Sequence, residues 1–547
     1  MRLTSSYSFD HVFHRQRGVI DQHFVSSLQP VVDGSDEGVL ATVLQLKLLG
    51  ASPRISRQPG DMVNFGSMRG FFPKSIRTWS DVMGYISEGA HPNETATGID
   101  DYKICDIWAG RISDKTPEVM GETKIWLLYG NGRALVGNGE MGGIGRFETS
   151  ASFLDAPNLV SGSSVLVHRY AMQEGVFLSK KISDCWITMT ARVEGMNPEE
   201  AAQSFESRFG NPTATYTSDG LGSLIRFRVP ISETPGSLLW QLESETIAPV
   251  EPLQSPMDVG PLPALSPEGE ISFESQALPD RLEDVDALVL GAGGLGSWAI
   301  PLVMSGCDPE NSSITIIDDD EEVEVHNLNR QVLYRPEDIG KPKAISARER
   351  IIECFNLERR AVTSIQSRLE ANHCYATPDE EIEDSISLEE ITGGDSVRDQ
   401  SDERISSALD SMQVALSCLD NQFSRTALNR ACHQRGVTMV NGGCEGTTGL
   451  VEAFSDGRCM VCSYGVEEAL SMEKVSCQEE GARPVSSLVT TSSYVGSMMA
   501  CMALCELARQ RGVDVRMPDP RDLVDGKVSN RVTGSLPWVE GDCQVHL

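Results

Sequence analysis

Apolar runs of strand length alternate with helical segments along the second half of the chain. An apolar run, a glycine-rich turn and a helical segment follow one another at 286–306, and a second helical segment occupies 343–355. A parallel sheet with crossover helices is the usual result of such alternation. We therefore predict a Rossmann-like, doubly wound and mostly parallel α/β sheet for the C-terminal half. The other expected strands are 312–318, 412–420, 437–444 and 449–455, and a long helix is expected at 486–510.

The first half of the chain has a mixed pattern, which we interpret as a separate α+β domain. Its apolar runs at 122–130 and 163–172 have the length of strands. A helix is predicted at 197–210, which begins with Asn-Pro-Glu-Glu and ends at a glycine. The sequence shows no internal repeat, and no catalytic group of residues stands out in this half.

Proline density marks the boundary between the two halves. Residues 248–280 are rich in proline and lack helical or strand periodicity, so we interpret them as a linker. The predicted N-terminal domain is 1–247 and the predicted C-terminal domain is 281–547. Within the latter, the acidic and serine-rich stretch 375–410 is expected to be a flexible insertion.

The composition excludes several classes of protein. The formal net charge is −33, which argues against nucleic-acid binding, and 35 of the 46 basic residues are arginine. No run of about 20 apolar residues is present, so no membrane span is expected. The N-terminus lacks the apolar core of a signal peptide. We therefore expect a cytoplasmic protein whose 14 cysteines are reduced and serve as metal or catalytic groups before disulfides.

A glycine-rich turn follows the first apolar run of the C-terminal half. Glycine permits a tight turn and lets backbone N–H groups approach a phosphate, and the following helix N-terminus favours an anion. An acidic residue after the next strand, in the run Asp-Asp-Asp at 318–320, could hold a ribose. These features predict nucleotide binding and leave a dehydrogenase open. The glycines are Gly291, Gly293, Gly294 and Gly296.

Polar residues at fixed offsets then favour ATP over a dinucleotide. The segment Asn-Leu-Asn-Arg-Gln at 327–331 and Gly-Lys-Pro-Lys at 340–343 supply an Arg and a Lys that could neutralise a polyphosphate. Asp420 follows a further expected strand, where its carboxylate could hold Mg²⁺.

Taken together, these motifs resemble those of the ubiquitin-activating-like adenylyltransferase superfamily, of the molybdopterin-synthase and thiamine sulfur-carrier adenylyltransferase type. The resemblance covers the C-terminal half and implies the following site. ATP would be held by the glycine turn and by Asp318 or Asp319, the choice being uncertain by one position. Phosphates would contact Asn327, Arg330, Gln331 and Lys343, and Mg²⁺ would be bound by Asp420 beside Asn421. The catalytic residues would be Arg330, Lys343, Asp420 and Cys477.

Cysteine spacing adds a metal site to this resemblance. Cys459 and Cys462 form one pair, and Cys543 with His546 forms another of the same spacing, a ligand set that suits tetrahedral Zn²⁺. Family members commonly carry paired cysteines at these two places. Cys477 stands where related proteins often have the cysteine that attacks the acyl-adenylate to give a thioester.

One family element is missing from its usual place. An Arg-Tyr-x-Arg-Gln element normally precedes the glycine turn, and in relatives one of its arginines often reaches the partner subunit's ATP. Here the preceding region lacks it, and the similar Arg-Ile-Ser-Arg-Gln at 54–58 lies far earlier in the chain. This weakens the expectation of a homodimer with shared sites, which the resemblance otherwise supports.

The resulting hypothesis is an adenylyltransferase that activates the C-terminal carboxylate of a small ubiquitin-like or sulfur-carrier protein. A downstream conjugating partner would then receive the acyl group. The alternative substrate is a ribosomal precursor peptide, and a tRNA-modifying carboxylate activator is a further alternative. Rival classes are a non-catalytic peptide-binding scaffold and an NAD-dependent oxidoreductase.

Overall fold

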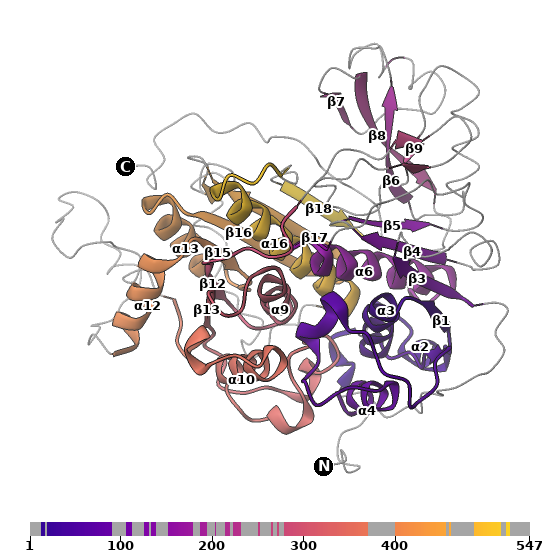
Figure 1. Ribbon diagram of the computed structural model, residues 1–547, viewed down its shortest axis with the longest axis horizontal. Helices are drawn as coiled ribbons and strands as arrows, with labels where there is room; N and C mark the ends of the chain where they lie inside the picture. The colour runs from indigo at the N-terminus through magenta and orange to yellow at the C-terminus, as the bar shows by residue number, and fades with distance from the viewer. Residues whose placement is uncertain are drawn as a thin grey trace.

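The structure is a computed structural model, and it describes the parts of the chain that position the sheets and the candidate site (Figure 1). The described residues are 12–16, 19–89, 105–111, 125–130, 133–137, 151–178, 186–193, 203, 214–218, 222–230, 250–251, 264–265, 271–272, 278–369, 400–455, 459–460, 486–515 and 521–525.

A seven-stranded sheet forms the C-terminal half, with the strand order β14-β13-β12-β15-β16-β17-β18. The pairs from β14 to β16 are parallel, and β17 and β18 pair antiparallel. This arrangement confirms the predicted Rossmann-like sheet. The strands are β12 (Asp286–Leu290), β13 (Ser313–Ile317), β14 (Val362–Ile365), β15 (Val414–Ser417), β16 (Thr438–Glu445), β17 (Thr448–Phe454) and β18 (Arg521–Asp525).

Helices cover both faces of this sheet, because its central strands are apolar on both sides. Leu288 and Leu290 belong to one buried cluster, with α12 and α13, whereas Ala287 and Val289 belong to the other, with α9 and α16. The helices are α9 (Gly296–Gly306), α10 (Lys343–Phe355), α12 (Gln400–Ser411), α13 (Gln422–Gln434) and α16 (Val489–Gln510).

The N-terminal half contains a second, five-stranded sheet with the order β2-β1-β3-β4-β5. Its first three pairs are parallel and the last is antiparallel. The strands are β1 (Val31–Gly34), β2 (Arg54–Ile55), β3 (Ile107–Arg111), β4 (Ile125–Gly130) and β5 (Arg133–Gly137). The helices of this half are α2 (Gln22–Ser27), α3 (Asp36–Leu49), α4 (Trp79–Gly89) and α6 (Asp155–Gln173), with short 3-10 turns η1 (His14–Gln16) and η2 (Gly66–Phe71).

The two sheets repeat one topology. The order β2-β1-β3-β4-β5 corresponds strand by strand to β13-β12-β15-β16-β17, with the same parallel and antiparallel pairs. In each half a helix follows the first strand of the sheet in chain order, α3 after β1 and α9 after β12, and a long helix follows the antiparallel strand, α6 after β5 and α16 after β17. No repeat is visible in the sequence, because a shared topology needs only a shared pattern of apolar strands and helices.

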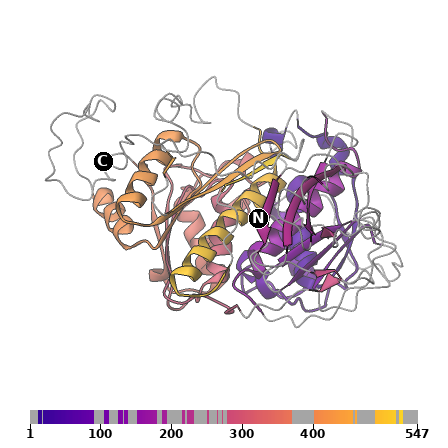
Figure 2. The ribbon, with the colours of Figure 1, turned by 90° about the horizontal axis from the view of Figure 1, so that it is seen from above.

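The two halves share a core. α6 and α16 lie against each other between the sheets (Figures 1 and 2). The hydroxyl oxygens of Ser164 and Ser493 are 2.7 Å apart across this contact, and Ser493 donates to Gln45 Oε1 at 3.0 Å. The Arg335 guanidinium covers the Tyr85 ring at 3.2 Å from its centroid. One apolar cluster therefore runs through both halves.

Smaller sheets lie between α6 and β12 in the sequence. An antiparallel sheet has the order β7-β8-β6-β9, and β10 pairs with β11. Part of the proline-rich segment predicted as a linker thus forms strand pairs. These strands are β6 (Trp186–Val193), β7 (Ala214–Ser218), β8 (Gly222–Pro230), β9 (Val250–Glu251), β10 (Ala264–Leu265) and β11 (Ile271–Ser272).

Two sequence-based expectations are wrong. The run 163–172 is not a strand but part of the buried helix α6, because periodicity cannot distinguish a short fully apolar strand from a buried helix. Residues 375–399 of the expected flexible insertion lie outside the described residues, whereas its residues 400–410 belong to the packed helix α12, in which Ile405 and Leu409 are fully buried. Its four-residue spacing places both side chains on one face, which the many serines and acids obscure. Most of the helix predicted at 197–210 lies outside the described residues.

None of the helices in the described part of the chain is both long and apolar enough to cross a membrane.

Candidate nucleotide site

The glycine turn between β12 and α9 brings the backbone close to its neighbours. Gly291 has φ +88°, a conformation that glycine adopts without strain. A Cβ atom on Gly291 would lie 2.6 Å from the Cys418 carbonyl oxygen, and one on Gly296 would lie 1.9 Å from the Gly291 carbonyl oxygen. By contrast, a Cβ atom on Gly293 would meet nothing nearer than Gln331 Nε2 at 3.9 Å. The middle of the turn therefore leaves room for a ligand beside its backbone.

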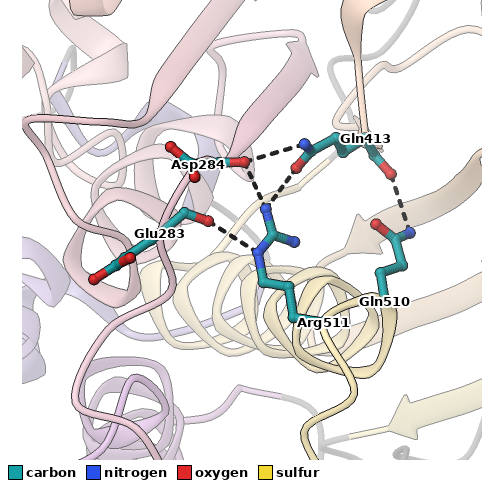
Figure 3. Close-up of a pocket in the computed structure, with 5 residues that line it drawn as sticks. All are labelled: Glu283, Asp284, Gln413, Gln510 and Arg511. Carbon is teal, nitrogen blue, oxygen red and sulfur yellow. Dashed lines mark hydrogen bonds between the residues drawn. The ribbon is translucent and has the colours of Figure 1, made fainter.

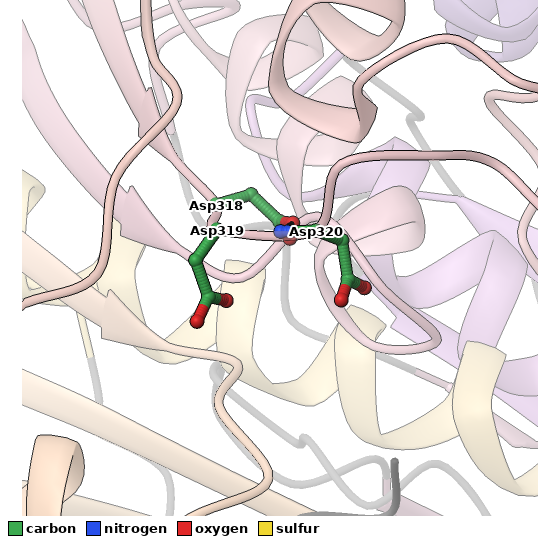
Figure 4. A group of neighbouring side chains, drawn as sticks. All are labelled: Asp318, Asp319 and Asp320. Atoms are coloured by element: carbon green, nitrogen blue, oxygen red, sulfur yellow. Dashed lines mark hydrogen bonds between the residues drawn. The ribbon is translucent and has the colours of Figure 1, made fainter.

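Three consecutive aspartates follow β13 beside this turn (Figure 4). Asp318 is buried, and its carboxylate accepts the Ala292 N–H at 2.5 Å and the Asp320 N–H at 2.9 Å. Burial raises the pKa of Asp318 to about 6, although the charge of Lys343 opposes the shift. Asp319 is exposed, and the oxygens of the three side chains lie within 4.8 Å of one another. Asp318 therefore shapes the turn, whereas Asp319 is the acid that a ligand can reach.

Two basic side chains lie buried beside the aspartates. Lys343 is the first residue of α10, is 5% exposed, and forms an ion pair with Asp320. Arg330 is 6% exposed, and its Nη1 donates to the His326 carbonyl oxygen at 2.6 Å and to Asn329 Oδ1 at 3.0 Å. Its side chain lies near the turn, because a Cβ atom on Gly294 would be 4.0 Å from Arg330 Nε.

A third positive charge comes from the N-terminal half. His326 has its pKa lowered to about 3, first by burial and then by the charges of Arg330, Arg15, Lys343 and His14. Arg15 belongs to η1, and its carbonyl oxygen accepts the Ser487 N–H at 2.9 Å. Positive side chains from both halves thus lie close to one neutral imidazole.

Sequence reasoning missed Arg15. Residues 13–16 read Phe-His-Arg-Gln, which is close to the Tyr-x-Arg-Gln end of the element expected before the glycine turn. Relatives carry this element next to the glycine turn, whereas Arg15 acts on His326 from the start of the chain. The other candidate, 54–58, belongs to β2 and the loop after it, and its Arg57 bonds to Asp33 of β1 and to Asp36 at the start of α3.

The remaining residues of the Asn-Leu-Asn-Arg-Gln segment are buried next to Arg330. Asn327 is 2% exposed, and its Oδ1 accepts the Glu324 N–H at 2.9 Å, which closes the turn η4 (Val325–Asn327). Gln331 is 3% exposed, and its Oε1 accepts no hydrogen bond from any residue in the described part of the chain. A buried amide oxygen in this state is costly, so a ligand or water that donates to it would be favoured.

The segment after β15 supplies the predicted Mg²⁺ ligand. Asp420 is exposed, and it lies close enough to Asp319 for its charge to raise the pKa of that carboxyl, an effect second to burial and to Asp320. Asn421 caps α13, with Oδ1 accepting the Ser424 N–H at 2.8 Å. Neighbouring carboxylates of this kind suit a hard divalent cation.

The predicted zinc ligands and nucleophile lie mostly outside the described residues. Of them, only Cys459 is described, and it is buried. Cys462, Cys477, Cys543 and His546 fall in the other segments. The segment that carries Cys477 ends at Ser486, whose carbonyl oxygen accepts the Gly446 N–H at 2.7 Å. The N–H of the next residue, Ser487, donates to the Arg15 carbonyl oxygen, so residues 486–487 lie beside Arg15.

A pocket of about 530 Å³ lies at the opposite edge of the sheet (Figure 3). Arg511 lines the pocket. Its guanidinium donates hydrogen bonds to the carbonyl oxygens of Glu283 at 2.9 Å and Asp284 at 2.6 Å and to Gln413 Oε1 at 2.8 Å. Ligands of open α/β sheets bind beyond the carboxyl ends of the strands, whereas this pocket lies before the strands begin. We interpret the hydrogen bonds of Arg511 as a structural link between the end of α16 and the sheet.

The C-terminal half is similar in sequence to known proteins. Residues 270–516 match the ThiF family. The molybdopterin-synthase adenylyltransferase of Salmonella typhimurium is 25% identical over 236 residues, which are 43% of this chain and 77% of that protein. The sulfur carrier protein ThiS adenylyltransferase of Escherichia coli is 25% identical over 260 residues, which are 48% of this chain and 84% of that protein.

Among solved structures, E. coli MccB with ATP is 16% identical and covers 49% of this chain and 68% of that one, at a TM-score of 0.34. This likeness adds nothing to the topology described above. The family match covers the segment that holds the glycine turn, the aspartates, Arg330, Lys343 and Asp420. The C-terminal half of the chain therefore carries a ThiF family domain.

Proposed function

We propose that the carboxyl edge of the C-terminal sheet binds ATP and Mg²⁺ and adenylates the C-terminal carboxylate of a small ubiquitin-like or sulfur-carrier protein. One observation carries the proposal. Lys343, paired with Asp320, and Arg330, next to Gly294, lie beside a glycine turn with open space at Gly293, and the charge of Arg15 acts on His326 together with theirs. Positive charges gathered at a helix N-terminus and an open backbone suit a polyphosphate.

Each group has a distinct part in the proposed reaction. The carrier's terminal carboxylate attacks the α-phosphorus of ATP, the bond to the β-phosphate oxygen breaks, and pyrophosphate leaves. Arg330, Lys343 and Arg15 neutralise the charge that develops on the phosphates. Asp420 would hold Mg²⁺, which would withdraw charge from the phosphates.

We propose that Asp319 rather than Asp318 holds the ribose. Asp318 already accepts two backbone N–H groups, from Ala292 and Asp320, and is buried. Asp319 is exposed beside the same turn. Its carboxylate is therefore available to accept hydrogen bonds from ribose hydroxyl groups.

The later acyl transfer and the zinc site remain proposals from the family pattern. We propose that the Cys477 thiolate attacks the acyl carbon of the adenylate, so that AMP leaves and a thioester forms. Cys459, Cys462, Cys543 and His546 would bind structural Zn²⁺. Metal analysis of the purified protein should find one zinc per chain, and Cys459→Ser should lose it. A metal-free wild type would refute the zinc site.

Carrier-dependent exchange of labelled pyrophosphate into ATP tests the proposed function. The wild type should exchange only when a carrier with a free C-terminal carboxylate is present. Lys343→Ala should lower the exchange rate by about 100-fold or more, because a buried cation at the phosphates is removed.

Lys341→Ala is the matched control, since Lys341 is exposed and pairs with Asp338 at 3.3 Å, away from the aspartate triplet. It should retain the wild-type rate. Precursor peptides form a second arm, and exchange with a peptide alone would replace the carrier as substrate. Tight NAD binding without exchange would favour an oxidoreductase instead.

A further inference from the structure

The register of the two sheets allows the halves to be aligned residue by residue. Gly34 ends β1 with φ +134°, and a Cβ atom there would lie 1.8 Å from the Ala109 carbonyl oxygen. Gly291 follows β12 with φ +88°, and its Cβ atom would meet the Cys418 carbonyl oxygen. Both glycines thus have a positive φ and lie too close to the backbone of the neighbouring parallel segment to carry a Cβ atom. Gly34 is therefore the structural counterpart of Gly291.

The alignment places an arginine where the C-terminal half has Asp318. Val32 pairs with Ile55, and its counterpart Val289 pairs with Ile316. Two residues beyond these partners stand Arg57 in one half and Asp318 in the other. Arg57 therefore replaces the aspartate whose carboxylate accepts a backbone N–H of the glycine turn. Arg57 instead donates to the Gly34 carbonyl oxygen.

The same alignment replaces the predicted Mg²⁺ ligand. Gly34 pairs with Ala109, so Ala109 corresponds to Cys418, the neighbour of Gly291. Two residues further on, Arg111 stands where the C-terminal half has Asp420. A cation thus occupies the position from which a carboxylate would bind the metal.

Acidic side chains occupy the turn that would receive phosphates. Where the C-terminal turn has glycines, the N-terminal turn has Asp36 and Glu37. Arg57 bonds to Asp36 Oδ1 at 3.1 Å and to Asp33 Oδ1 at 2.7 Å. Glu37 is 3% exposed and accepts Arg111 Nη2 at 2.7 Å and Ser67 Oγ at 2.6 Å. The would-be pocket is filled by its own ion pairs.

We infer that the N-terminal half is a charge-inverted second copy of the nucleotide-binding fold, whose pocket is closed by Arg57 and Arg111, so that the chain has one nucleotide site. The N-terminal half serves the other site as a permanent intramolecular partner. It packs α6 on α16 and presents Arg15 to His326. The N-terminal half thus takes the place of the second subunit in the expected homodimer. The inference rests on the proposed function only for the identity of the nucleotide.

Nucleotide stoichiometry tests the inference on the full chain. We expect titration calorimetry with α,β-methylene-ATP and Mg²⁺ to give one site per chain, and light scattering to give a monomer both with and without the analogue. Lys343→Ala should weaken binding at least tenfold. Arg57→Ala should lower the melting temperature but leave stoichiometry and affinity unchanged, and Arg57→Lys is the milder variant if Arg57→Ala does not fold.

The outcomes separate this inference from the proposed function. Two sites per chain would overturn the inference while leaving adenylation intact. A single site lost in Arg57→Lys and kept in Lys343→Ala would place the nucleotide in the N-terminal half and overturn both. No binding by a folded wild type would overturn the proposed function, whereas the closed N-terminal pocket would stand.

Discussion

At the scale of single residues, the charged side chains of the candidate site already form ion pairs or hydrogen bonds with neighbouring residues. Lys343 pairs with Asp320, and Asp318 accepts two backbone N–H groups. These contacts hold the side chains in place before a ligand arrives. Preorganised groups of this kind act on a developing charge without reorganising during the reaction.

Asp318 gives the stability of the protein a specific pH dependence. Burial raises its pKa to about 6, above the ordinary value, so the folded state binds the proton more tightly than the unfolded chain. Its contribution to stability is therefore full at a pH below the ordinary aspartate value and is lost as the pH rises through about 6. Asp318→Asn cannot lose a proton and should not show this loss.

Urea unfolding of both proteins between pH 4 and 7.5 checks the prediction. The difference in unfolding free energy should move in favour of Asp318→Asn as the pH rises to about 6 and then become constant. Parallel curves over the whole range would contradict the assigned burial. The difference in unfolding free energy between the two proteins cancels the contributions of the other groups that titrate in this range.

At the scale of elements, α12 shows how an acidic segment can still be part of the core. Leu409 is fully buried, whereas the neighbouring Asp410 is exposed and pairs with Arg435 at 2.8 Å. We expect Leu409→Ala to lower the unfolding free energy by about 2–5 kcal/mol. Asp410→Ala should change it by less than about 1 kcal/mol, because surface ion pairs contribute little. Denaturant unfolding that gives equal effects for the two variants would refute the packing of α12.

The sequence predicted most C-terminal elements well, because their apolar patterns are bounded by glycine or polar residues. The strand, glycine turn and helix at 286–306 and the helix at 343–355 are confirmed. Elements buried on every side were harder, and α6 was mistaken for a strand. The N-terminal sheet was not predicted as a repeat, since its turn has lost the glycines that mark the C-terminal one.

Residues that act from a distance along the chain were also beyond sequence reasoning. Arg330, Lys343 and the aspartates lie within one stretch and could be grouped from spacing. Arg15 could not, because only the packing of the N-terminal half against residues 486–487 brings it to His326.

At the scale of the whole molecule, the two halves form one cooperative unit. A single apolar cluster spans both, and Ser493 joins Gln45 and Ser164 at the contact between α6 and α16. We expect one calorimetric unfolding transition for the two large sheets, with equal calorimetric and van't Hoff enthalpies. Two separated transitions would contradict the shared core. Arg335→Leu, which removes the cation over Tyr85, should lower this transition without splitting it.

The central claim is that one triphosphate site lies at the carboxyl edge of the C-terminal sheet and is completed by the N-terminal half. A crystal structure of the full chain with α,β-methylene-ATP and Mg²⁺ tests it most directly. We predict phosphates at the Gly291–Gly296 turn in contact with Arg330, Lys343 and Arg15, a metal ion at Asp420, and no nucleotide at the Gly34 turn. Nucleotide bound elsewhere, or phosphates that contact neither Arg330 nor Lys343, would contradict the account.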